Sequence, residues 1–464
     1  MSSNDGKKVG FVSLGCPKNL VDSEVMMGML QRDGYTITAD AHDADVLVVN
    51  TCSFIESAQR ESVDTILELA EFKKQGKARR VIVAGCMVER FREEIAREIP
   101  EVDAMVGTNE LARISSACSG QAATLPILPG DFFDPTPTAP YLYDDLTPRL
   151  LSTPRHSVYI KIAEGCDHPC TFCIIPQFRG KFRSRRFESV AAEAGRLARQ
   201  GAREIVLVGQ DSTCYGDDLG LKNGLATLLD RLALTAREAN QEGADLRWIR
   251  TLYFYPNRVN QPLLDAVARH PELCKYVDMP LQHASAAVLK RMKRGAHGDI
   301  FLKLIEKIRR TVPGAALRTS FIVGFPGETE QDFAELCDFV RAARFDWLGV
   351  FGYSDEATNQ ASRLDAKVPA EVIERRKREL MRLQRGISKK LRKQAIGGRF
   401  PVLVEGPSEE TDLLWQGRLE GQAPEIDGKV LINDVAEGIT PTAGEFATVE
   451  ITAAQDYDLV GRLV

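Results

Sequence analysis

Three cysteines that lie close together in the sequence are the residues best suited to do chemistry. Cys166, Cys170 and Cys173 have the spacing C-x3-C-x2-C. A 4Fe–4S cluster normally takes four cysteine ligands, one for each iron. Three thiolates leave the fourth iron open, so that it can bind a substrate or a cofactor. The alternative is a structural zinc site completed by His168, but such sites usually divide their ligands between two separated pairs, and no second pair lies nearby.

Three further cysteines, Cys16, Cys52 and Cys86, each follow a short apolar run at equivalent positions in successive strand–helix units. The carboxyl ends of parallel strands meet at the edge of the sheet where α/β folds bind ligands, so we expect these cysteines to converge. The alternative is that each is a buried core residue, but three equivalent positions favour a second three-cysteine cluster. The other cysteines match no ligand pattern and are interpreted as structural. They are Cys118, Cys214, Cys274 and Cys337.

Residues 7–125, which contain the second group of cysteines, have the pattern of a parallel α/β domain. Three apolar runs alternate there with helical patterns, as in βαβ units. Asn19 is a candidate N-cap of the first helix, and Gly34 a candidate stop. Residues 126–155 are punctuated by prolines and have no sustained periodicity, so we expect a linker that acts as a lid or a strap. The apolar runs are residues 8–14, 46–50 and 80–84.

Residues 156–368 repeat a strand and then a helix six times. Six units are too few for a closed eight-stranded barrel, so we expect an open partial barrel with its chemistry at the carboxyl ends of the strands. The first strand ends next to Gly165 and Cys166, which puts the C-x3-C-x2-C motif at that edge. The expected strands are residues 158–162, 204–208, 248–254, 275–279, 316–323 and 347–352.

Polar side chains near the ends of these strands are candidates for binding a small cofactor. Such groups suit a zwitterion, a ribose diol and an adenine edge, and the glycines beside Phe325 let the backbone approach a flat ring. The alternative is that they are caps and turn residues, as Asp211 and Ser212 could be. The candidates are Gln210, Asp211, Ser212, Asp278, Gln282, Arg318 and Phe325.

The last two segments differ sharply in charge. Residues 369–396 form a basic helical segment, for which a solvated face is the default interpretation and RNA binding the alternative. Residues 397–464 contain five short strand-like runs between glycines, which indicate a small β-barrel of the oligonucleotide-binding kind. With four basic residues against thirteen acidic ones, its net charge is −9. We therefore expect it to prefer a basic protein to the phosphates of RNA.

The composition limits the class of protein. The chain has 464 residues, a hydrophobic content of 44% and a formal net charge of −5, so it should hold about three domains and does not resemble a strongly basic nucleic-acid-coating protein. No run approaches ~18 apolar residues, so no membrane span is expected. The polar start carries no signal region, and ten cysteines then indicate metal or redox work in a reducing compartment. We expect a cytoplasmic protein.

The motif from Gly165 to Pro176 resembles the radical S-adenosylmethionine superfamily, and its continuation to Arg185 is similar to the methylthiotransferase branch. The strings SLGCPKNLVDSE around Cys16 and NTCSFI around Cys52 resemble the amino-terminal domain of that branch, and residues 397–464 resemble its TRAM domain. The resemblance covers nearly the whole chain.

This resemblance implies two 4Fe–4S clusters and S-adenosylmethionine as cofactors. One cluster would be held by Cys166, Cys170 and Cys173 and would cleave S-adenosylmethionine to a radical that removes hydrogen from carbon. The auxiliary cluster would be held by the other three cysteines, and a second S-adenosylmethionine would supply the methyl group. The seven candidates at the strand ends resemble the cofactor pocket of the family, although Gly209-Gln210-Asp211 stands where the family has Gly-Gly-Glu.

Within the family, the sequence is most similar to enzymes that add a methylthio group to the β-carbon of an aspartate in the decoding-centre ribosomal protein S-twelve. One alternative is the branch that modifies transfer-RNA adenosine, in which Gln-Met-Asn typically follows the first cysteine where this chain has Pro17-Lys18-Asn19. Another is a non-catalytic RNA-binding iron–sulfur protein. The implied partners are the ribosomal protein and a reducing electron carrier such as flavodoxin or ferredoxin.

Overall fold

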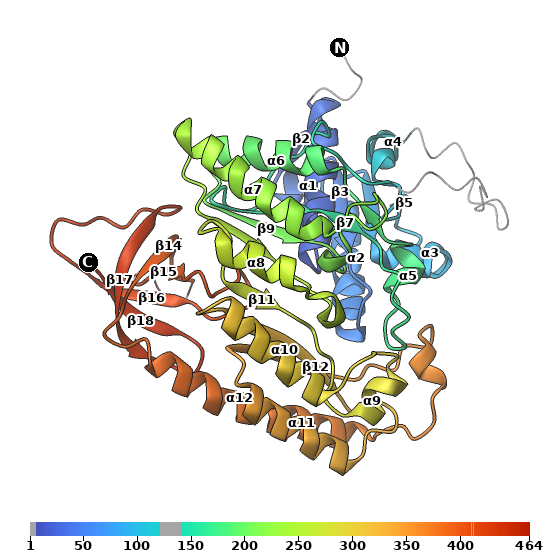
Figure 1. Cartoon of the computed structure of the whole chain (residues 1–464). Coiled ribbons are helices and arrows are strands. Elements are labelled where there is room, and N and C mark those ends of the chain that lie inside the picture. The colour runs from blue at the N-terminus through green and yellow to red at the C-terminus, as the bar shows by residue number, and fades with distance from the viewer. Residues whose placement is uncertain (1–5, 121–140, 410, 412) are drawn as a thin grey trace. The chain divides into compact units, whose positions relative to one another are not determined.

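The computed structural model describes residues 6–120, 141–409, 411 and 413–464 (Figure 1). The chain divides into two compact units. The first contains residues 1–152, 163–168 and 174–189, and the second contains residues 153–162, 169–173 and 190–464. Both units are therefore discontinuous in sequence, and the chain passes from the first unit to the second within the C-x3-C-x2-C motif, after His168, and back to the first unit after Cys173.

A five-stranded parallel sheet with the order β2-β1-β3-β4-β5 forms the core of the first unit, which confirms the predicted parallel α/β domain. β3 is buried along its whole length, and this burial explains its almost continuous apolar sequence. The strands are β1 (Lys8–Ser13), β2 (Thr36–Thr38), β3 (Val46–Thr51), β4 (Arg80–Gly85) and β5 (Ala104–Val106), with a separate antiparallel pair of β7 (Ala163–Glu164) and β8 (Arg183–Ser184). The helices are α1 (Pro17–Arg32), α2 (Glu56–Gln75), α3 (Cys86–Glu98), α4 (Ile114–Ser119) and α5 (Ile175–Phe178).

The first helix begins earlier than predicted. α1 starts at Pro17 with Cys16 as its N-cap, so the prediction that Asn19 caps the helix is wrong. Proline is favoured in the first turn, because the N–H that it lacks would have no helical partner there. Asn19 lies inside the helix, and its side-chain amide donates to the carbonyl oxygens of Leu14 at 3.0 Å and Thr51 at 2.8 Å. It therefore joins the loops that follow β1 and β3.

Part of the predicted linker 126–155 is fastened to α1. Residues 126–140 lie outside the described residues, and residues 141–152 contain no helix or strand. The buried carboxylate of Glu24 in α1 accepts hydrogen bonds from Arg149 Nη2 at 2.6 Å and from the backbone N–H of Ser152 at 2.8 Å. A Cβ at Gly28 would lie 2.5 Å from the backbone nitrogen of Arg149. This segment is thus a strap within the first unit.

Six parallel strands form the predicted open partial barrel in the second unit. Two three-stranded sheets, β10-β9-β6 and β11-β12-β13, are connected through a parallel bridge between Ile249 and Leu273. β10 ends at Thr251, earlier than predicted, because Tyr253 adopts a left-handed φ of +65°. The strands are β6 (Ser157–Lys161), β9 (Glu204–Val208), β10 (Trp248–Thr251), β11 (Tyr276–Asp278), β12 (Ala316–Val323) and β13 (Trp347–Gly352).

Helices lie along the outer side of these strands (Figure 1). The chain returns through them from the carboxyl end of one strand to the start of the next, so that all six carboxyl ends share one edge. Among the described residues, none of the helices has both the length and the apolar character needed to cross a membrane. The helices are α6 (Phe187–Arg199), α7 (Gly224–Gln241), α8 (Gln261–Arg269), α9 (Ala286–Arg291), α10 (Gly298–Thr311), α11 (Glu330–Ala343) and α12 (Ala370–Lys393).

The last strands close into a small barrel with the order β14-β15-β16-β18-β17, as predicted. This barrel packs against the amino-terminal ends of the partial barrel. The hydroxyl of Tyr276, the first residue of β11, donates to Asp427 at 2.7 Å, and the indole N–H of Trp347, the first residue of β13, donates to the carbonyl of Gly421 at 2.7 Å. The small barrel thus covers the end opposite the carboxyl edge. Its strands are β14 (Arg399–Pro407), β15 (Trp415–Arg418), β16 (Val430–Val435), β17 (Phe446–Ala454) and β18 (Leu459–Leu463).

α12 carries the cations of the basic segment, and some of them have acidic partners within the second unit. The buried guanidinium of Arg376 lies 3.1 Å from Glu328 and 2.8 Å from Glu330. Arg385 and Lys389 lie 3.6 Å and 3.4 Å from the carboxylate of Asp456. The helix therefore joins the partial barrel to the small barrel through charge, and a role in RNA binding stays a prediction.

Candidate metal centres and cofactor-binding edge

The carboxyl edge of the sheet in the first unit carries three cysteines. Cys16 follows β1, Cys52 follows β3, and Cys86 opens α3 directly after β4. β1, β3 and β4 are neighbours in the sheet, so their ends lie side by side. A Cβ added to Gly15, which has a φ of +91°, would lie 3.1 Å from the Cys52 sulfur, so the first two loops touch. The structure therefore gathers these cysteines at one edge.

Arg179 lies buried in the same place. Its Nη2 is 3.1 Å from the sulfur of Cys86 and 2.6 Å from the side-chain oxygen of Asn19. Its Nη1 donates to Asp22 at 2.7 Å and to Glu164 at 3.2 Å. The side chain is only 2% exposed, and a guanidinium cannot lose its proton in a protein. A permanent cation is therefore built into the cysteine site.

The three thiols differ in acidity because their surroundings differ. Burial raises the pKa of Cys16, but the charges of Lys18 and Arg179 and two backbone N–H groups outweigh it, so the pKa lies below its ordinary value. Burial raises the pKa of Cys52. Burial also raises the pKa of Cys86 to about 12, although Arg179 opposes the change. A metal group that binds thiolates must therefore displace protons from Cys52 and Cys86.

These residues fit an iron–sulfur cluster. The site offers three thiols from separate loops and one fixed cation, and cluster ligands are thiolates whose negative charge a buried arginine can balance. The side-chain amide of Asn19 joins the residue after β1 to the last residue of β3, and hydrogen bonds around a metal site commonly orient its ligands. That Cys16, Cys52 and Cys86 bind iron stays a prediction.

The C-x3-C-x2-C motif begins in the first unit with a tight turn. Gly165 has a φ of +83°, and a Cβ there would lie 2.1 Å from the carbonyl oxygen of Lys181, so only glycine fits. The backbone N–H of Cys166 donates to the carbonyl of Gly180 at 3.1 Å. After the motif, Phe178 of α5 packs against Cys86, which explains why this short helix belongs to the first unit.

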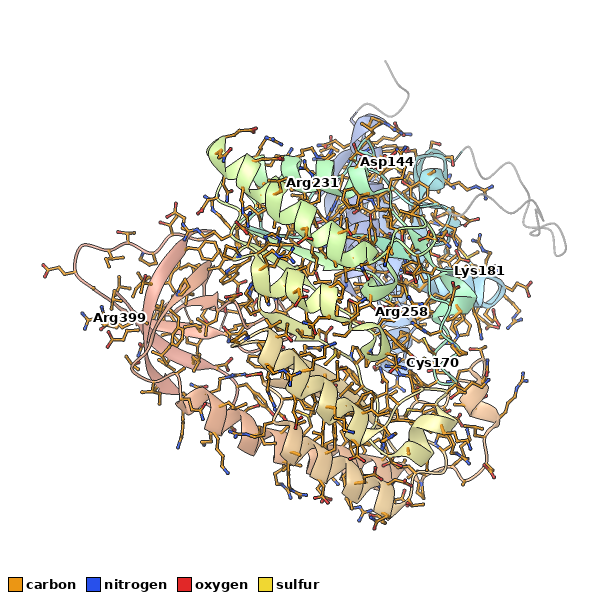
Figure 2. The ribbon with its side chains drawn as sticks, viewed as in Figure 1. Asp144, Cys170, Lys181, Arg231, Arg258 and Arg399 are labelled. Carbon is orange, nitrogen blue, oxygen red and sulfur yellow. The ribbon has the colours of Figure 1, made fainter. Side chains whose placement is uncertain are left out.

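The other two cysteines of the motif belong to the second unit. The backbone N–H of Cys173 donates to the carbonyl of Cys170 at 3.2 Å and forms a turn. Arg294 Nη1 lies 3.7 Å from the sulfur of Cys170, which Figure 2 labels, and Arg294 Nη2 donates to the carbonyl of Pro280 at 2.7 Å. The backbone N–H of Thr171 donates to the carbonyl of Met292. That the three motif cysteines share one cluster stays a prediction.

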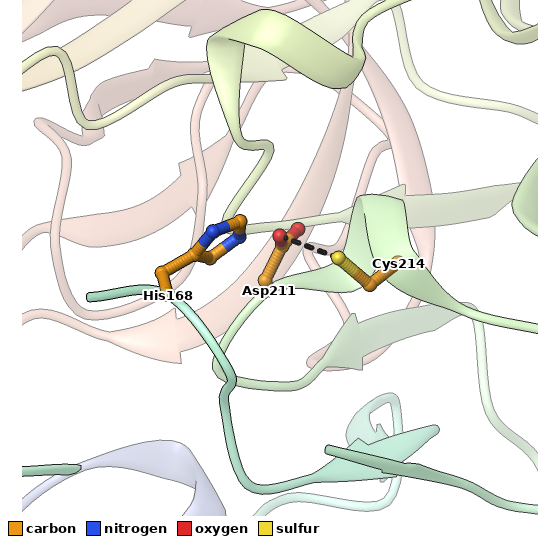
Figure 3. Close-up of side chains that lie close together, drawn as sticks. All are labelled: His168, Asp211 and Cys214. Carbon is orange, nitrogen blue, oxygen red and sulfur yellow. Dashed lines mark hydrogen bonds between the residues drawn. The ribbon is translucent and has the colours of Figure 1, made fainter. Parts of the chain in front are cut away.

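Two of the cofactor-pocket candidates serve the local fold. The carboxylate of Asp211 caps the turn that follows it by accepting from the backbone N–H of Thr213 at 2.8 Å, and the thiol of Cys214 donates to it at 2.9 Å (Figure 3). The hydroxyl of Ser212 donates to the carbonyl of Leu252 at 2.6 Å. Burial, followed by the negative charge of Asp211, raises the pKa of Cys214, so this thiol stays protonated.

The side chains of three other candidates have contacts with other residues of the protein. Arg318 Nη1 donates to Asp278 at 2.9 Å, and Arg318 Nε lies 3.6 Å from Asp427 of the small barrel. These two side chains therefore form part of the junction between the barrels. The ring of Phe325 is fully buried, and its centroid lies 5.3 Å from that of Tyr353 in an edge-to-face contact.

Gln210 and Gln282 keep partly exposed side chains at the carboxyl edge of the partial barrel. Gln282 has a φ of +73°, and Tyr253 at the same edge has a φ of +65°. Left-handed conformations of such residues are costly and concentrate at ligand sites. The two glutamines are therefore the candidates best placed to reach a bound cofactor, and this role stays a prediction.

Three family models match the chain in order. An uncharacterized protein family, UPF0004, matches residues 8–107, the radical SAM superfamily matches residues 160–340, and the TRAM domain matches residues 396–464. These matches agree with the parallel α/β domain, the partial barrel and the small closed barrel described above.

Similar proteins match the chain over nearly its whole length. A ribosomal protein uS12 methylthiotransferase RimO of Solibacter usitatus is 63% identical over 98% of this chain and 95% of its own. A RimO of Koribacter versatilis is 58% identical over 99% of this chain and 96% of its own, and one of Myxococcus xanthus is 46% identical over 100% and 93%. This chain belongs to the RimO family. It is a radical S-adenosylmethionine methylthiotransferase.

A solved structure shares the fold of this RimO-family chain. The radical S-adenosylmethionine methyltransferase TsrM of Kitasatospora setae has a TM-score of 0.55 and 16% sequence identity, and the match covers 75% of each chain. At this identity the likeness concerns the fold alone.

Residues of this RimO-family member that the sequence analysis did not assign to a binding site complete the site around Cys16, Cys52 and Cys86. They are Asn19, Asp22, Glu164 and Arg179, and all four are buried. A signal was present for Arg179, because it lies in the string after the C-x3-C-x2-C motif that resembles the methylthiotransferase branch. Its contact with Cys86 could not be predicted, since the two residues are 93 positions apart.

Proposed function

We propose that this enzyme adds a methylthio group to the β-carbon of an aspartate in the ribosomal protein uS12. The observation that carries the proposal is the similarity, over almost the entire chain, to proteins named as uS12 methylthiotransferases. Both groups of three cysteines occur in this chain, and one of them lies on a sheet edge beside a buried cation.

The cofactors are two 4Fe–4S clusters and S-adenosylmethionine. Cys166, Cys170 and Cys173 would hold the cluster that supplies reductive cleavage of S-adenosylmethionine, and Cys16, Cys52 and Cys86 would hold the auxiliary cluster that supplies the site of sulfur transfer. The chain's own residues orient the cysteine ligands and balance their negative charge. Arg294 donates toward Cys170, and Arg179 donates toward Cys86. Protein groups of this kind position a cofactor that carries the difficult chemistry.

We place the reaction in the cytoplasm, with a low-potential carrier such as flavodoxin or ferredoxin as the electron donor. The support is the use of free cysteines, since all ten lack a disulfide and thiols persist in reducing compartments. Domain limits at residues 7–125, 126–155, 156–368, 369–396 and 397–464 are part of the same proposal.

Modification of transfer-RNA adenosine is the alternative activity, and the small barrel disfavours it. All four of its basic side chains have an acidic partner within 4.0 Å in the structure. Arg418 is also buried, and therefore cannot join a basic surface patch. A barrel that bound RNA would need free cations for phosphate neutralisation. The pairs are Arg399–Glu450, Arg418–Glu204, Lys429–Glu409 and Arg462–Asp434.

Intact-mass analysis of uS12 tests the proposal. The reconstituted enzyme, S-adenosylmethionine and a reductant are incubated with unmodified uS12, and fragment spectra locate the change. The expected result is the replacement of one hydrogen on one aspartate by one methylthio group. Transfer RNA is incubated in parallel. If uS12 stays unmodified and the transfer RNA gains a methylthio-adenosine, the enzyme has the alternative activity.

A further inference from the structure

The cysteine site of the first unit is organised around one guanidinium group. The side-chain amide of Asn19 ties the loop after β1 to the loop after β3. The side-chain oxygen of Asn19 in turn accepts a hydrogen bond from Arg179, which also reaches the sulfur of Cys86 at the start of α3. The loops that carry the three cysteines are therefore linked through Asn19 and Arg179.

The two ends of this guanidinium have different partners. Nη1 is held by the carboxylates of Asp22 and Glu164, whose side chains are 2% and 4% exposed. Nη2 is left to point at Asn19 and at the Cys86 sulfur. Because a planar guanidinium presents its donors in a rigid fork, fixing one end aims the other. The N–H···S contact is thus imposed by the surrounding protein.

A donor of this kind matters to a cluster because hydrogen bonds to the sulfurs and the net charge of the surroundings set its reduction potential. Reduction adds one negative charge, and a fixed positive charge nearby stabilises the reduced form. Because the Arg179 side chain is only 2% exposed, water screens its charge little, which strengthens the effect.

We infer that Arg179 is a positioning residue for the auxiliary iron–sulfur cluster, holding the Cys86 sulfur in place and raising the reduction potential of that cluster. The inference rests on the proposed function, since it concerns the second of the two clusters. Arg179 lies six residues after Cys173, so the segment that leaves one cysteine motif supplies the cation of the other cysteine site.

The test measures the auxiliary cluster alone. Cys166, Cys170 and Cys173 are changed to alanine in the full chain, so that iron can bind only at the auxiliary site. Arg179→Gln and Arg179→Lys are then compared with the parent by redox titration and by electron paramagnetic resonance of the reduced cluster. We expect a more negative midpoint potential and an altered spectrum for Arg179→Gln, and a smaller shift for Arg179→Lys, which keeps the charge and loses the planar fork.

Arg149→Gln is the matched control. Arg149 is also a buried arginine of the first unit that pairs with a carboxylate of α1, Glu24, and it is bonded to none of the cysteines. Arg149→Gln should lower the stability of the folded chain without changing the midpoint potential of the cluster. If Arg179→Gln does not retain iron while Arg149→Gln does, the positioning role is supported, and Arg179→Lys then carries the redox measurement.

The outcomes separate the inference from the proposed function. A parent variant that binds no iron would overturn the two-cluster proposal itself. A parent that binds iron, with the same potential and spectrum in both Arg179 variants, would overturn only the role of Arg179.

Discussion

Arg418 of the small barrel and Glu204 at the start of β9 form an ion pair whose side chains are 2% and 0% exposed. Glu204 also accepts from Arg250 Nε at 2.8 Å and from the hydroxyl of Ser157 at 2.9 Å, so its carboxylate is fully engaged. Arg418 in turn donates to Glu405 at 2.6 Å. The small barrel is therefore attached to the partial barrel by buried charge, and it is not a freely tethered module.

Arg418→Ala should be strongly destabilising. It leaves the carboxylate of Glu204 buried with one of its two guanidinium partners missing, and breaking a buried pair typically costs about 3–5 kcal/mol. The measurement is urea unfolding of the metal-free chain, followed by signals from the second unit.

Arg399→Ala is the control for this change. Figure 2 labels Arg399 on the same small barrel, and its pair with Glu450 is exposed, with 67% of the arginine side chain accessible. Such pairs contribute ~0–1 kcal/mol. Equal losses of stability from the two substitutions would contradict the view that the buried pair attaches the barrel.

Glu204 should make the free energy of unfolding depend on pH in the acidic range. Burial raises its pKa, but the charges of Arg418 and Arg250 outweigh burial and lower it from 4.5 to about 2. A lowered folded-state pKa contributes stability above the unfolded value of 4.5, and that contribution is lost as the pH falls toward 2. A shift of this size corresponds to on the order of 3 kcal/mol.

The comparison is between the wild type and Glu204→Gln. The difference in their melting temperatures should shrink as the pH falls from 4.5 toward 2, whereas Glu450→Gln, at an exposed pair, should show no such trend. A difference that stays constant across this range would show that Glu204 is not held charged in the folded protein.

Replacing Cys166, Cys170 and Cys173 together with alanine should abolish formation of 5′-deoxyadenosine from S-adenosylmethionine. The radical source is then absent, while the thiols of Cys16, Cys52 and Cys86 are untouched. Chromatographic assay after anaerobic reconstitution measures the product. Wild-type amounts of 5′-deoxyadenosine from this variant would show that the motif is not the source of the radical.

Replacing Cys16, Cys52 and Cys86 should have the reverse effect. Iron per chain should roughly halve, and 5′-deoxyadenosine should still form without methylthiolation, because each cysteine group is proposed to hold its own cluster. Iron analysis and product assay on the same sample give both readings. Unchanged iron would make these three cysteines ordinary core residues, and Cys118→Ala, a buried cysteine outside both groups, is the control.

The acidic surface of the small barrel should favour a basic ribosomal protein over transfer RNA. Its net charge is −9, so the full chain should bind uS12 in low salt, lose affinity as salt screens the attraction, and show no measurable affinity for transfer RNA. Glu437→Gln with Glu445→Gln, both exposed on the barrel, should weaken uS12 binding.

The matched control neutralises two exposed acids on α11, Glu335→Gln with Asp338→Asn, and should leave uS12 binding nearly unchanged. Equal effects of the two pairs would mean that total charge, and not the barrel surface, attracts the partner. Because the small barrel lies at the end of the partial barrel opposite the carboxyl edge, we expect its substitutions to change KM more than kcat.

The strands could be predicted from the sequence because their signals are local. Residues 204–208, 316–323, 347–352 and 459–463 are short runs rich in apolar residues, and β9, β12, β13 and β18 have these ends. The prediction failed at Asn19, where Pro17 allowed an earlier helix start and the amide was needed to join two loops. The side chain of Asn19 therefore serves tertiary structure in place of a helix cap.

The sites could be predicted only where a repeated pattern marked them. Cys16, Cys52 and Cys86 were found because each follows a strand of the same sheet. Arg179 was missed because its contacts with Asp22 and Asn19 join positions 157 and 160 apart. Asp278 and Arg318 pair with each other, and Arg318 Nε also lies 3.6 Å from Asp427 of the small barrel, a contact that no local sequence signal encodes. Their place in a cofactor pocket stays a prediction.

The first unit is assembled from three separate stretches of chain, and this limits how the family could be recombined. Its five-stranded sheet and the arginine that pairs with Glu24 come from residues 1–152, Glu164 comes from residues 163–168, and Arg179, the partner of Cys86, comes from residues 174–189. A chimera that exchanged only residues 1–120 between two relatives would carry Glu24 and Cys86. It would lack Arg149 and Arg179, the cations that evolved beside them. Swaps of this unit should therefore succeed only when residues 141–152 and 163–189 travel with it.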